Sequence, residues 1–501
     1  MFCSLQSFSV TGIEAAVIKV EVDVGNGLPC FDMVGYLSSE VKEARERVRV
    51  ALRNSGYPVP AKRITVNLSP ADERKGGTGY DLAIALGILC NQGFLPWDVT
   101  EGAGILGELG LDGTVRAVPG VLPCVIAAKK AGFHSVLLPA ENAEEGALVE
   151  GIRVYGVRTL TEAVEHFTGV GGTLAKPVRF RPDESTAEDF CDIHGQFLAK
   201  RAAEIAAAGM HNLLLSGPPG AGKTMLARRI PGILPKLTFE ESLEITKVYS
   251  VAGLVPSEGG MLKKRPFRAP HHTATVTALA GGGRSPMPGE MSLASGGVLF
   301  LDELPEFPRA SIEILRQPLE ERCIQVARLQ GSVLYPASFM LVAAMNPCPC
   351  GYYPDRNRCR CTPDQITRYR SRISRPILDR IDISVVVHGL SPKELTGGSN
   401  GEKSAAVRKR VEIARRRQAK RYKGTSFRYN SDVPGSQLSE FFAVTGEAER
   451  VASEYAERTN CTARGYHRMW KVARTIADLT DSEKVLPEHM AEAAGFRTEW
   501  R

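Results

Sequence analysis

The chain has 501 residues, of which 43% are apolar and 24% are charged, a composition typical of soluble globular proteins. A chain of this length is expected to form two to four domains, each with its own core. No stretch approaches the roughly 18 consecutive apolar residues that a membrane helix needs. The first ten residues also lack the basic segment and apolar run of a signal peptide. We therefore expect a cytoplasmic protein that does not contact a membrane.

The charge and the cysteine content indicate what kind of partner and what redox compartment to expect. The net charge is +7, and in residues 391–501 lysine and arginine outnumber aspartate and glutamate by 21 to 15. This excess favours a polyanionic partner for the C-terminal part of the chain. Seven of the eleven cysteines are scattered along the chain, which is typical of a reduced cytosolic protein and not of a disulfide scaffold.

Residues 1–168 predict a compact α+β domain, because strands and helices follow one another without strict alternation. Residues 17–24 alternate apolar and charged side chains, which predicts a half-buried strand. Residues 38–56 predict a helix with a serine N-cap and a glycine stop. A strand, a helix, a hairpin and a second helix are then predicted at "RITVNL", "DLAIALGIL", "GELGLDGTVRAVPG" and "VLPCVIAAKKAG".

The remainder of the chain is expected to hold two more domains. Residues 169–190 combine Gly, Pro and mixed charge without periodicity, which predicts a linker. Residues 191–390 predict an α/β domain of the nucleotide-binding type. After the break "LSPKELTGGSNGEKS", the pattern of residues 391–501 is helical.

A phosphate-binding loop is predicted at "GPPGAGKT", residues 217–224, which fits the pattern G-x-x-x-x-G-K-[ST]. An apolar strand precedes this loop and a helix follows it, so backbone N–H groups can surround phosphates at a helix N-terminus. We expect Lys223 to contact the β- and γ-phosphates of ATP and Thr224 to ligate Mg²⁺. The expected nucleotide-binding residues are Gly217, Pro218, Pro219, Gly220, Ala221, Gly222, Lys223, Thr224 and Asp302.

Two further apolar strands are predicted to end in polar residues. In "GGVLFLDELPEF", Asp302 is expected to hold Mg²⁺ and Glu303 to deprotonate the attacking water. The strand "FMLVAAMNP" ends in Asn346. Ligands of α/β sheets bind at the carboxyl ends of strands, so Asn346 can position the same water.

These groups on three strand ends resemble the AAA+ ATPases, whose active sites lie between subunits and borrow an arginine from the neighbour. The resemblance implies a multidomain α/β protein with an AAA+ P-loop core and a C-terminal helical lid. In "SRISRPILDRID", Arg380 is the best match to the borrowed arginine and Arg375 is the reserve. Such an arginine neutralises charge that develops in the transition state. The alternative is an arginine in a surface ion pair.

Longer segments resemble the magnesium-chelatase-related AAA+ proteins of the ComM/YifB type, over residues 5 to about 480. They include "NGLPCFDMVGY", "RPFRAPHHTAT" and "ARGYHRMWKVARTIADL". The resemblance implies an ATP-driven homohexameric motor, of the helicase or branch-migration type, that acts on single-stranded or branched DNA in homologous recombination or natural transformation. It also implies that Arg464 is a lid arginine that reaches the γ-phosphate of its own subunit. The alternative function is that of a magnesium-chelatase-like ATPase subunit, which drives remodelling or metal insertion in a protein partner.

The N-terminal domain resembles the proteolytic domain of Lon. Leu122 occupies the position of the catalytic lysine of Lon, and "GGTGYDLAIAL" replaces its serine-bearing turn without a serine. Serine–lysine proteolysis needs an amine that takes the hydroxyl proton. We therefore expect a catalytically inactive Lon-like domain that serves assembly or DNA contact.

Four cysteines are concentrated in "CPCGYYPDRNRCRC", where Cys348, Cys350, Cys359 and Cys361 form the pattern C-x-C-x8-C-x-C. Four thiolates satisfy the tetrahedral preference of Zn²⁺, although C-x-C is tighter than the usual C-x2-C spacing. A structural zinc, free thiols and a redox switch all stay open. A zinc with four sulfur ligands would have no open position for catalysis.

Two basic segments are candidates for DNA contact. Residues 403–423 carry ten basic residues and one acid, which predicts either a phosphate-binding helix or a solvated helix face. The segment after residue 264 could bring Arg265, Arg268 and Arg284 to DNA in a ring pore. On an extended chain the side chains of His271 and His272 would point apart, so we do not expect them to form a metal site.

Overall fold

A computed structural model gives the structure of the protein. It describes residues 2–96, 98, 100–169, 171–177, 180–183, 188–256, 259–283, 286–328, 331–389 and 401–497. The expected boundary between core and lid at residue 390 and one predicted DNA contact, Arg284, lie outside these residues. Within the described ranges, no helix is both long enough and apolar enough to cross a membrane.

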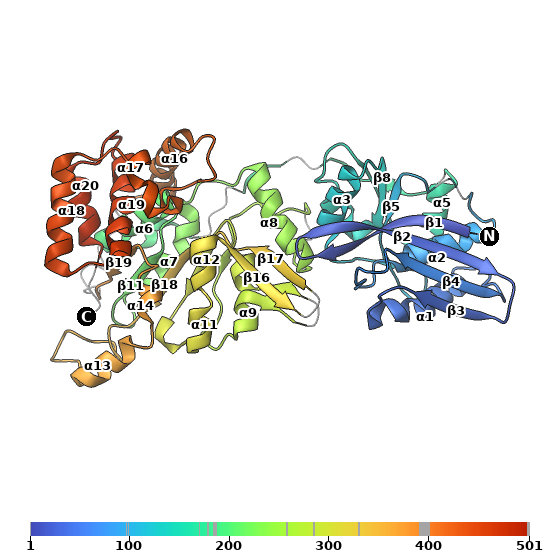
Figure 1. The fold of residues 1–501 in the computed structure, drawn as a ribbon, viewed down its shortest axis with the longest axis horizontal. Coiled ribbons are helices and arrows are strands. Elements are labelled where there is room, and N and C mark those ends of the chain that lie inside the picture. Colours follow the sequence, from blue (N-terminus) through green and yellow to red (C-terminus); the bar gives the residue numbers. More distant parts are fainter. Residues whose placement is uncertain are drawn as a thin grey trace.

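The molecule is elongated, with two lobes side by side (Figure 1). The N-terminal lobe lies on the right of the view, in blue and teal. The nucleotide-binding domain and the C-terminal helices together form the other lobe, in green to red.

An eight-stranded mixed sheet, with the order β10-β9-β8-β5-β1-β2-β4-β3, forms the N-terminal lobe. β1 (Phe2–Thr11) pairs with β2 (Glu14–Gly25) along its whole length. The predicted strand at 17–24 lies within β2, and the predicted helix at 38–56 is α1 (Ser39–Asn54). The other main elements are β3 (Cys30–Val34), β4 (Arg63–Ser69), α2 (Asp81–Asn91), β5 (Ala103–Ile105), α3 (Val121–Lys130), β8 (Ser135–Pro139), α4 (Ala143–Gly146), β9 (Arg153–Val157) and α5 (Leu160–Phe167).

The ends of the predicted linker, residues 169–190, belong to the two lobes. β10 (Thr173–Leu174) pairs with β9 and so extends the N-terminal sheet beyond residue 168. Its two residues are exposed and too few for a periodic pattern, so no strand is predicted there from the residues alone. At the other end, Phe190 is buried in the core of the second lobe.

A five-stranded sheet, in the order β12-β15-β18-β11-β19, forms the centre of the second lobe. All four neighbouring pairs are parallel, which confirms the predicted α/β type. The strands are β11 (Leu213–Ser216), β12 (Phe267–Arg268), β15 (Val298–Leu301), β18 (Met340–Met345) and β19 (Ile383–Val386). Around them lie α6 (Phe197–Gly209), α7 (Lys223–Ile233), α8 (Phe239–Val251), α9 (Val276–Ala280), α11 (Arg309–Glu313), α12 (Arg316–Glu321), the hairpin β16 (Cys323–Arg328) and β17 (Gly331–Pro336), α13 (Pro363–Arg370) and α14 (Arg375–Leu378).

The C-terminal residues are helical, as predicted, but they share a core with the nucleotide-binding domain. Val407 and Met469 belong to the same buried cluster as Ala203 of α6 and Leu213 of β11. Figure 1 shows the C-terminal helices packed around α6. These helices are α16 (Ser404–Arg421), α17 (Leu438–Phe441), α18 (Gly446–Thr459), α19 (Ala463–Leu479) and α20 (Pro487–Gly495).

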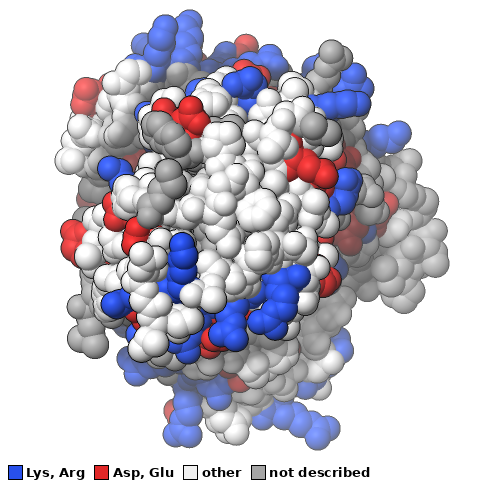
Figure 2. Space-filling model, turned by 90° about the vertical axis from the view of Figure 1, so that its right-hand side faces the viewer, with Lys and Arg blue, Asp and Glu red and all other residues white. Residues whose placement is uncertain are grey.

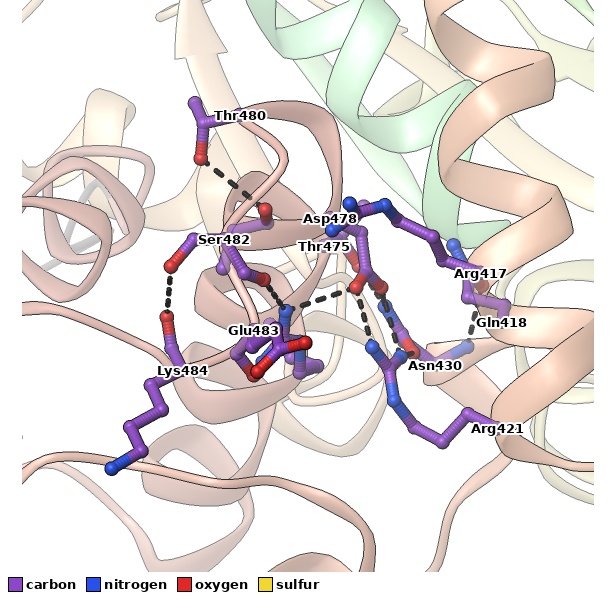
Figure 3. Close-up of polar contacts among 12 residues, drawn as sticks. Arg417, Gln418, Arg421, Asn430, Thr475, Asp478, Thr480, Ser482, Glu483 and Lys484 are labelled. Carbon is purple, nitrogen blue, oxygen red and sulfur yellow. Dashed lines mark hydrogen bonds and ion pairs between the residues drawn. The ribbon is translucent and has the colours of Figure 1, made fainter.

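A buried polar network joins α16 to α19 (Figure 3). Asp478 of α19 accepts hydrogen bonds from Arg421 at 2.9 Å, Arg474 at 3.0 Å and Asn430 at 2.9 Å. Asp478 and Arg474 are almost completely buried. Because buried charges need partners, this network holds the two helices in one arrangement.

The two lobes meet where α3 contacts α8. The backbone N–H groups of Gly120 and Leu122 donate to the backbone oxygen and the hydroxyl of Ser250, at 2.8 and 3.2 Å. The buried carboxylate of Glu145 also accepts from the Leu122 N–H at 2.9 Å. Leu122 is therefore part of the contact between the lobes.

Candidate nucleotide site

The predicted phosphate-binding residues, the two acids and Asn346 lie together at the carboxyl edge of the parallel sheet. β18 lies between β15 and β11, so Asn346 follows the central strand of these three. Asp302 and Glu303 follow β15 on one side, and the phosphate loop follows β11 on the other. The structure thus brings together five predicted site residues that are spread over more than 120 positions of the chain: Lys223, Thr224, Asp302, Glu303 and Asn346.

Lys223 is held inside the phosphate loop. Its ammonium group donates to the backbone oxygens of Gly217 at 2.7 Å and Pro218 at 2.9 Å, and to Oδ1 of Asn346 at 3.1 Å. Burial lowers the pKa of Lys223, whereas the charges of Asp302 and Glu303 act in the opposite direction. A phosphate that entered the loop would replace these oxygens as the partner of the ammonium group.

The loop has the backbone that phosphate binding requires. Gly222, directly before α7, has a φ of 88°, a conformation that glycine adopts without strain. The helix N-terminus behind it offers N–H groups and a favourable dipole to an anion. A cavity of about 410 Å³ opens here, lined by Pro219, Gly220, Ala221, Gly222, Lys223, Thr224, Met225, Asp302, Glu303, Met345 and Asn346.

Thr224 and Asp302 form a pair of oxygen ligands of the kind that Mg²⁺ prefers. The Thr224 hydroxyl donates to Oδ2 of Asp302 at 2.7 Å, so both oxygens lie within reach of one small ion. This donor set fits the predicted magnesium site. When bound, the ion would neutralise phosphate charge.

Glu303 projects into the cavity from a strained backbone. Its φ is 52°, which is uncommon for a residue with a side chain and is concentrated at functional sites. Oε2 of Glu303 lies 3.4 Å from Nδ1 of His272, so this histidine is a partner that the sequence analysis missed. The rings of His271 and His272 are 4.0 Å apart. The two side chains therefore do not point apart as predicted, because the chain turns at His272 and Thr273 and is not extended there.

The predicted arginines lie at the opposite, amino edge of the sheet. Arg380 lies three residues before β19, and its backbone oxygen accepts from the side chain of Asn212, the residue before β11. Arg380 is buried and forms an ion pair with Glu320 at 2.7 Å. Arg375, the reserve, is exposed.

Arg464 approaches the same carboxylate from the lid. Its guanidinium lies 3.8 Å from Glu320 and is 60% exposed. One helical turn later, Arg468 forms an ion pair with Asp382 at 2.6 Å, which fixes this part of α19 beside the start of β19. The structure therefore differs from the expectation that Arg464 reaches the γ-phosphate of its own subunit, because the phosphate loop lies at the other end of the strands.

The four cysteines form a compact cluster. All four Sγ atoms lie within 4.8 Å of one another, and three of the separations are 3.4, 3.6 and 3.8 Å. A tetrahedral ion with metal–sulfur bonds of about 2.3 Å places its sulfur ligands about 3.8 Å apart. A disulfide would require about 2.0 Å. The thiols are thus unlinked, and their separations fit the ligand set of a single tetrahedral metal ion.

Half of the basic residues in 403–423 form contacts within the lobe. Arg415, for example, donates to the backbone oxygen of Ala207 at 2.8 Å and lies over the ring of Tyr429. Others that contact backbone oxygens or acids are Arg408, Arg410, Arg417 and Arg421. A basic stripe on α16 is exposed instead, and consists of Lys409, Arg416 and Lys420.

The arginines predicted for a ring pore are also engaged within the lobe. Arg268 forms two hydrogen bonds of 2.6 Å with the carboxylate of Glu290. Arg265 donates to Gly296 at 2.7 Å and to Glu241 at 2.9 Å. Neither guanidinium is therefore presented to a ligand in this conformation.

Comparison with known proteins gives matches over most of the chain. Family models match at residues 20–142 (subunit ChlI of Mg-chelatase), 189–395 (magnesium chelatase, subunit ChlI) and 401–497 (magnesium chelatase, subunit ChlI C-terminal). Competence protein ComM of Haemophilus influenzae is 42% identical over 494 residues, which cover 97% of this chain and 95% of that protein. The uncharacterized protein YifB of Escherichia coli is 42% identical over 492 residues, with the same coverage.

A shorter match supports the resemblance to Lon. Lon protease 2 of Bacillus subtilis is 30% identical over 141 residues, which cover 28% of this chain and 25% of that protein. Together with the parallel sheet and its phosphate loop, these matches indicate an ATPase of the AAA+ type. The chain therefore belongs to the magnesium-chelatase-related family, as a protein of the ComM/YifB type.

Proposed function

We propose that the protein is an ATP-driven DNA motor, of the helicase or branch-migration type, that works as a ring of six identical subunits. The similarity to a competence protein favours a role in natural transformation or homologous recombination. The observation that carries the proposal is the separation of two half-sites. The phosphate-binding and acidic groups occupy one edge of the sheet, and the arginines occupy the other.

The groups at the carboxyl edge would bind and hydrolyse ATP. The N–H groups of the phosphate loop and the Lys223 ammonium would hold the phosphates. Thr224 and Asp302 would hold Mg²⁺, and Asn346 would orient the attacking water. The Glu303 carboxylate would take the proton of that water, as a general base does.

The arginines at the amino edge would complete the site of the neighbouring subunit. Arg380 and Arg464 share the Glu320 carboxylate, which is an anion in the place that a neighbour's γ-phosphate would take. A guanidinium supplied in trans stabilises the charge that spreads over the transferred phosphoryl group. Because Arg464 is exposed and Arg380 is buried, we propose that Arg464 contacts the neighbour's γ-phosphate first. Arg380 would contact it after breaking its own ion pair with Glu320.

The exposed stripe of Lys409, Arg416 and Lys420 is the surface of α16 that we propose for DNA. Intervals of seven and four residues place these three side chains on one face of the helix. Contact with DNA phosphates would release counterions and make the affinity sensitive to salt. Arg415 and Arg421, in contrast, are assigned to the stability of the lobe.

We propose a structural zinc in the four-cysteine cluster. The sulfur separations support a single tetrahedral ion, and four sulfur ligands leave no open position for substrate. Metal analysis of the purified protein should find one zinc per chain, lost in a variant with Cys348→Ser and Cys361→Ser. A wild-type protein without metal would remove this part of the proposal.

The N-terminal lobe is proposed as an inactive Lon-like domain that serves assembly. Its outer end has a broad area without acidic or basic residues, with lysines and arginines mainly at the margin (Figure 2). Such a surface suits contact with protein better than contact with the phosphates of DNA. Because Leu122 cannot take a proton, the purified protein should not cleave casein, and cleavage would overturn this assignment.

ATP turnover with and without a four-way DNA junction tests the proposed motor. Turnover should rise when the junction is added. A magnesium-chelatase-like subunit would instead be indifferent to DNA and respond to a protein partner. Turnover and assembly that are both unchanged by DNA would therefore contradict the motor.

A further inference from the structure

The cysteine loop is in direct contact with the phosphate loop. Gly351, between the two cysteine pairs, is buried and has a φ of 85°. A Cβ atom at this position would lie 2.5 Å from Cδ and 3.3 Å from Cγ of Pro219. The backbone of Gly351 thus approaches the ring of Pro219 so closely that not even a methyl group fits between them.

The position of Gly351 depends on the cysteine cluster. The Gly351 N–H donates to the backbone oxygen of Cys348 at 3.0 Å, and the Tyr353 N–H points to the sulfur of Cys348 at 3.4 Å. Cys348 is completely buried and follows Asn346 by two residues. Asn346 in turn accepts from the Lys223 ammonium. The cluster is therefore connected to the phosphate site through Gly351 and through Asn346.

Few apolar contacts hold this loop without a metal. Its buried cluster contains only Cys348, Cys359 and Ile366, with partly buried neighbours. Between β18 and α13, no described residue of the loop belongs to a helix or strand. Metal–thiolate bonds contribute folding energy outright in segments with so small a core.

We infer that the metal ion held by the four cysteines keeps Gly351 in contact with Pro219 of the phosphate loop, so that ATP affinity depends on metal occupancy. This inference rests on the proposed zinc site and assigns to it an effect on ATP binding. Without the metal, Gly351 would move away from Pro219, and the N–H groups of the phosphate loop would lose their fixed arrangement.

A pair of glycine substitutions tests the contact separately from the metal. Gly351→Ala adds a methyl group against Pro219. Gly424→Ala is the matched control, because Gly424 has the same φ of 85° and a Cβ there would meet nothing within 4 Å. Both variants should retain one metal per chain. Gly351→Ala should bind a fluorescent ATP analogue at least about tenfold more weakly than Gly424→Ala, as expected when a phosphate cradle is displaced.

Removal of the metal tests the dependence itself. The variant with Cys348→Ser and Cys361→Ser should lose the metal and bind the ATP analogue at least about tenfold more weakly. Cys461→Ser, which changes a half-exposed thiol of the lid, should retain both properties. Wild-type protein stripped by a chelator should lose ATP affinity and regain it when Zn²⁺ is added back.

The outcomes separate this inference from the proposals on which it rests. Normal ATP affinity in metal-loaded Gly351→Ala, or in stripped wild-type protein, would overturn the inference and leave the zinc site standing. Wild-type protein without metal would overturn both. A DNA-independent ATPase that shows the expected metal dependence would contradict only the motor.

Discussion

The substitution Asp478→Asn tests whether the lid is held by buried charge. Asp478 is completely buried and accepts hydrogen bonds from two arginines and an asparagine (Figure 3). The asparagine side chain has nearly the same shape but no charge. Arg474, which is only 1% exposed, would then lose its counterion.

The expected cost follows from the burial of the pair. Removing one partner of a buried ion pair costs about 3–5 kcal/mol, because the other charge is left uncompensated. Every 1.4 kcal/mol is a factor of ten, so the population of the opened lid should rise roughly 100- to 4,000-fold. Asp481→Asn is the control. Asp481 pairs with Arg417 but is 79% exposed, and such a pair contributes less than about 1 kcal/mol, or about fivefold.

Hydrogen exchange of the amides in α19 is the appropriate assay, because a protein of several domains need not unfold in one step. Peptides that include Arg474 should exchange much faster in Asp478→Asn than in Asp481→Asn. Equal protection in the two variants would refute the reasoning that buried charge fixes the lid.

Three further predictions concern the site and the contact between lobes. Glu303→Gln should lower ATP turnover about 100-fold or more while ATP binding persists, since only the proposed general base is removed; unchanged turnover would exclude that role. His272→Ala should raise DNA-independent turnover by up to about fivefold, the equivalent of about 1 kcal/mol for a half-exposed polar contact, because it releases Glu303; unchanged turnover with an unchanged response to DNA would show that the contact has no effect. Burial raises the pKa of Glu145, despite hydrogen bonds from Ser250, Leu122 and Asn142. The folded protein therefore binds this proton more tightly, and the resulting stability is lost as pH rises from about 4.5 through the folded pKa. Melting temperatures of Glu145→Gln and wild type should diverge in favour of the variant over that range, and a constant difference would contradict the assignment.

Local patterns predicted much of the fold and of the phosphate site. The loop from Gly217 to Thr224 and the acids after β15 are short motifs whose flanking strands could be read directly. The parallel sheet then follows, because such motifs occupy the carboxyl ends of adjacent strands. The structure places Asn346 between them for the same reason.

Contacts between distant segments could not be predicted. His272 meets Glu303 only because β12 and β15 are neighbours, and Glu320 meets Arg464 only because the lid folds back on the core. The prediction for the basic residues of α16, either a phosphate-binding or a solvated helix face, was incomplete for a related reason. Composition cannot distinguish Arg415, which packs inside the lobe, from Lys409 and Lys420, which are exposed.

Mixing two inactive variants tests most directly whether the ATP site is shared between subunits. Lys223→Ala removes the phosphate ligand, and Arg464→Ala removes an exposed arginine from the opposite edge of the sheet. Each variant alone should turn over almost no ATP. An equimolar mixture should regain about a quarter of the wild-type rate, because about one interface in four combines an intact loop with an intact arginine. A mixture no more active than its components would contradict the shared site.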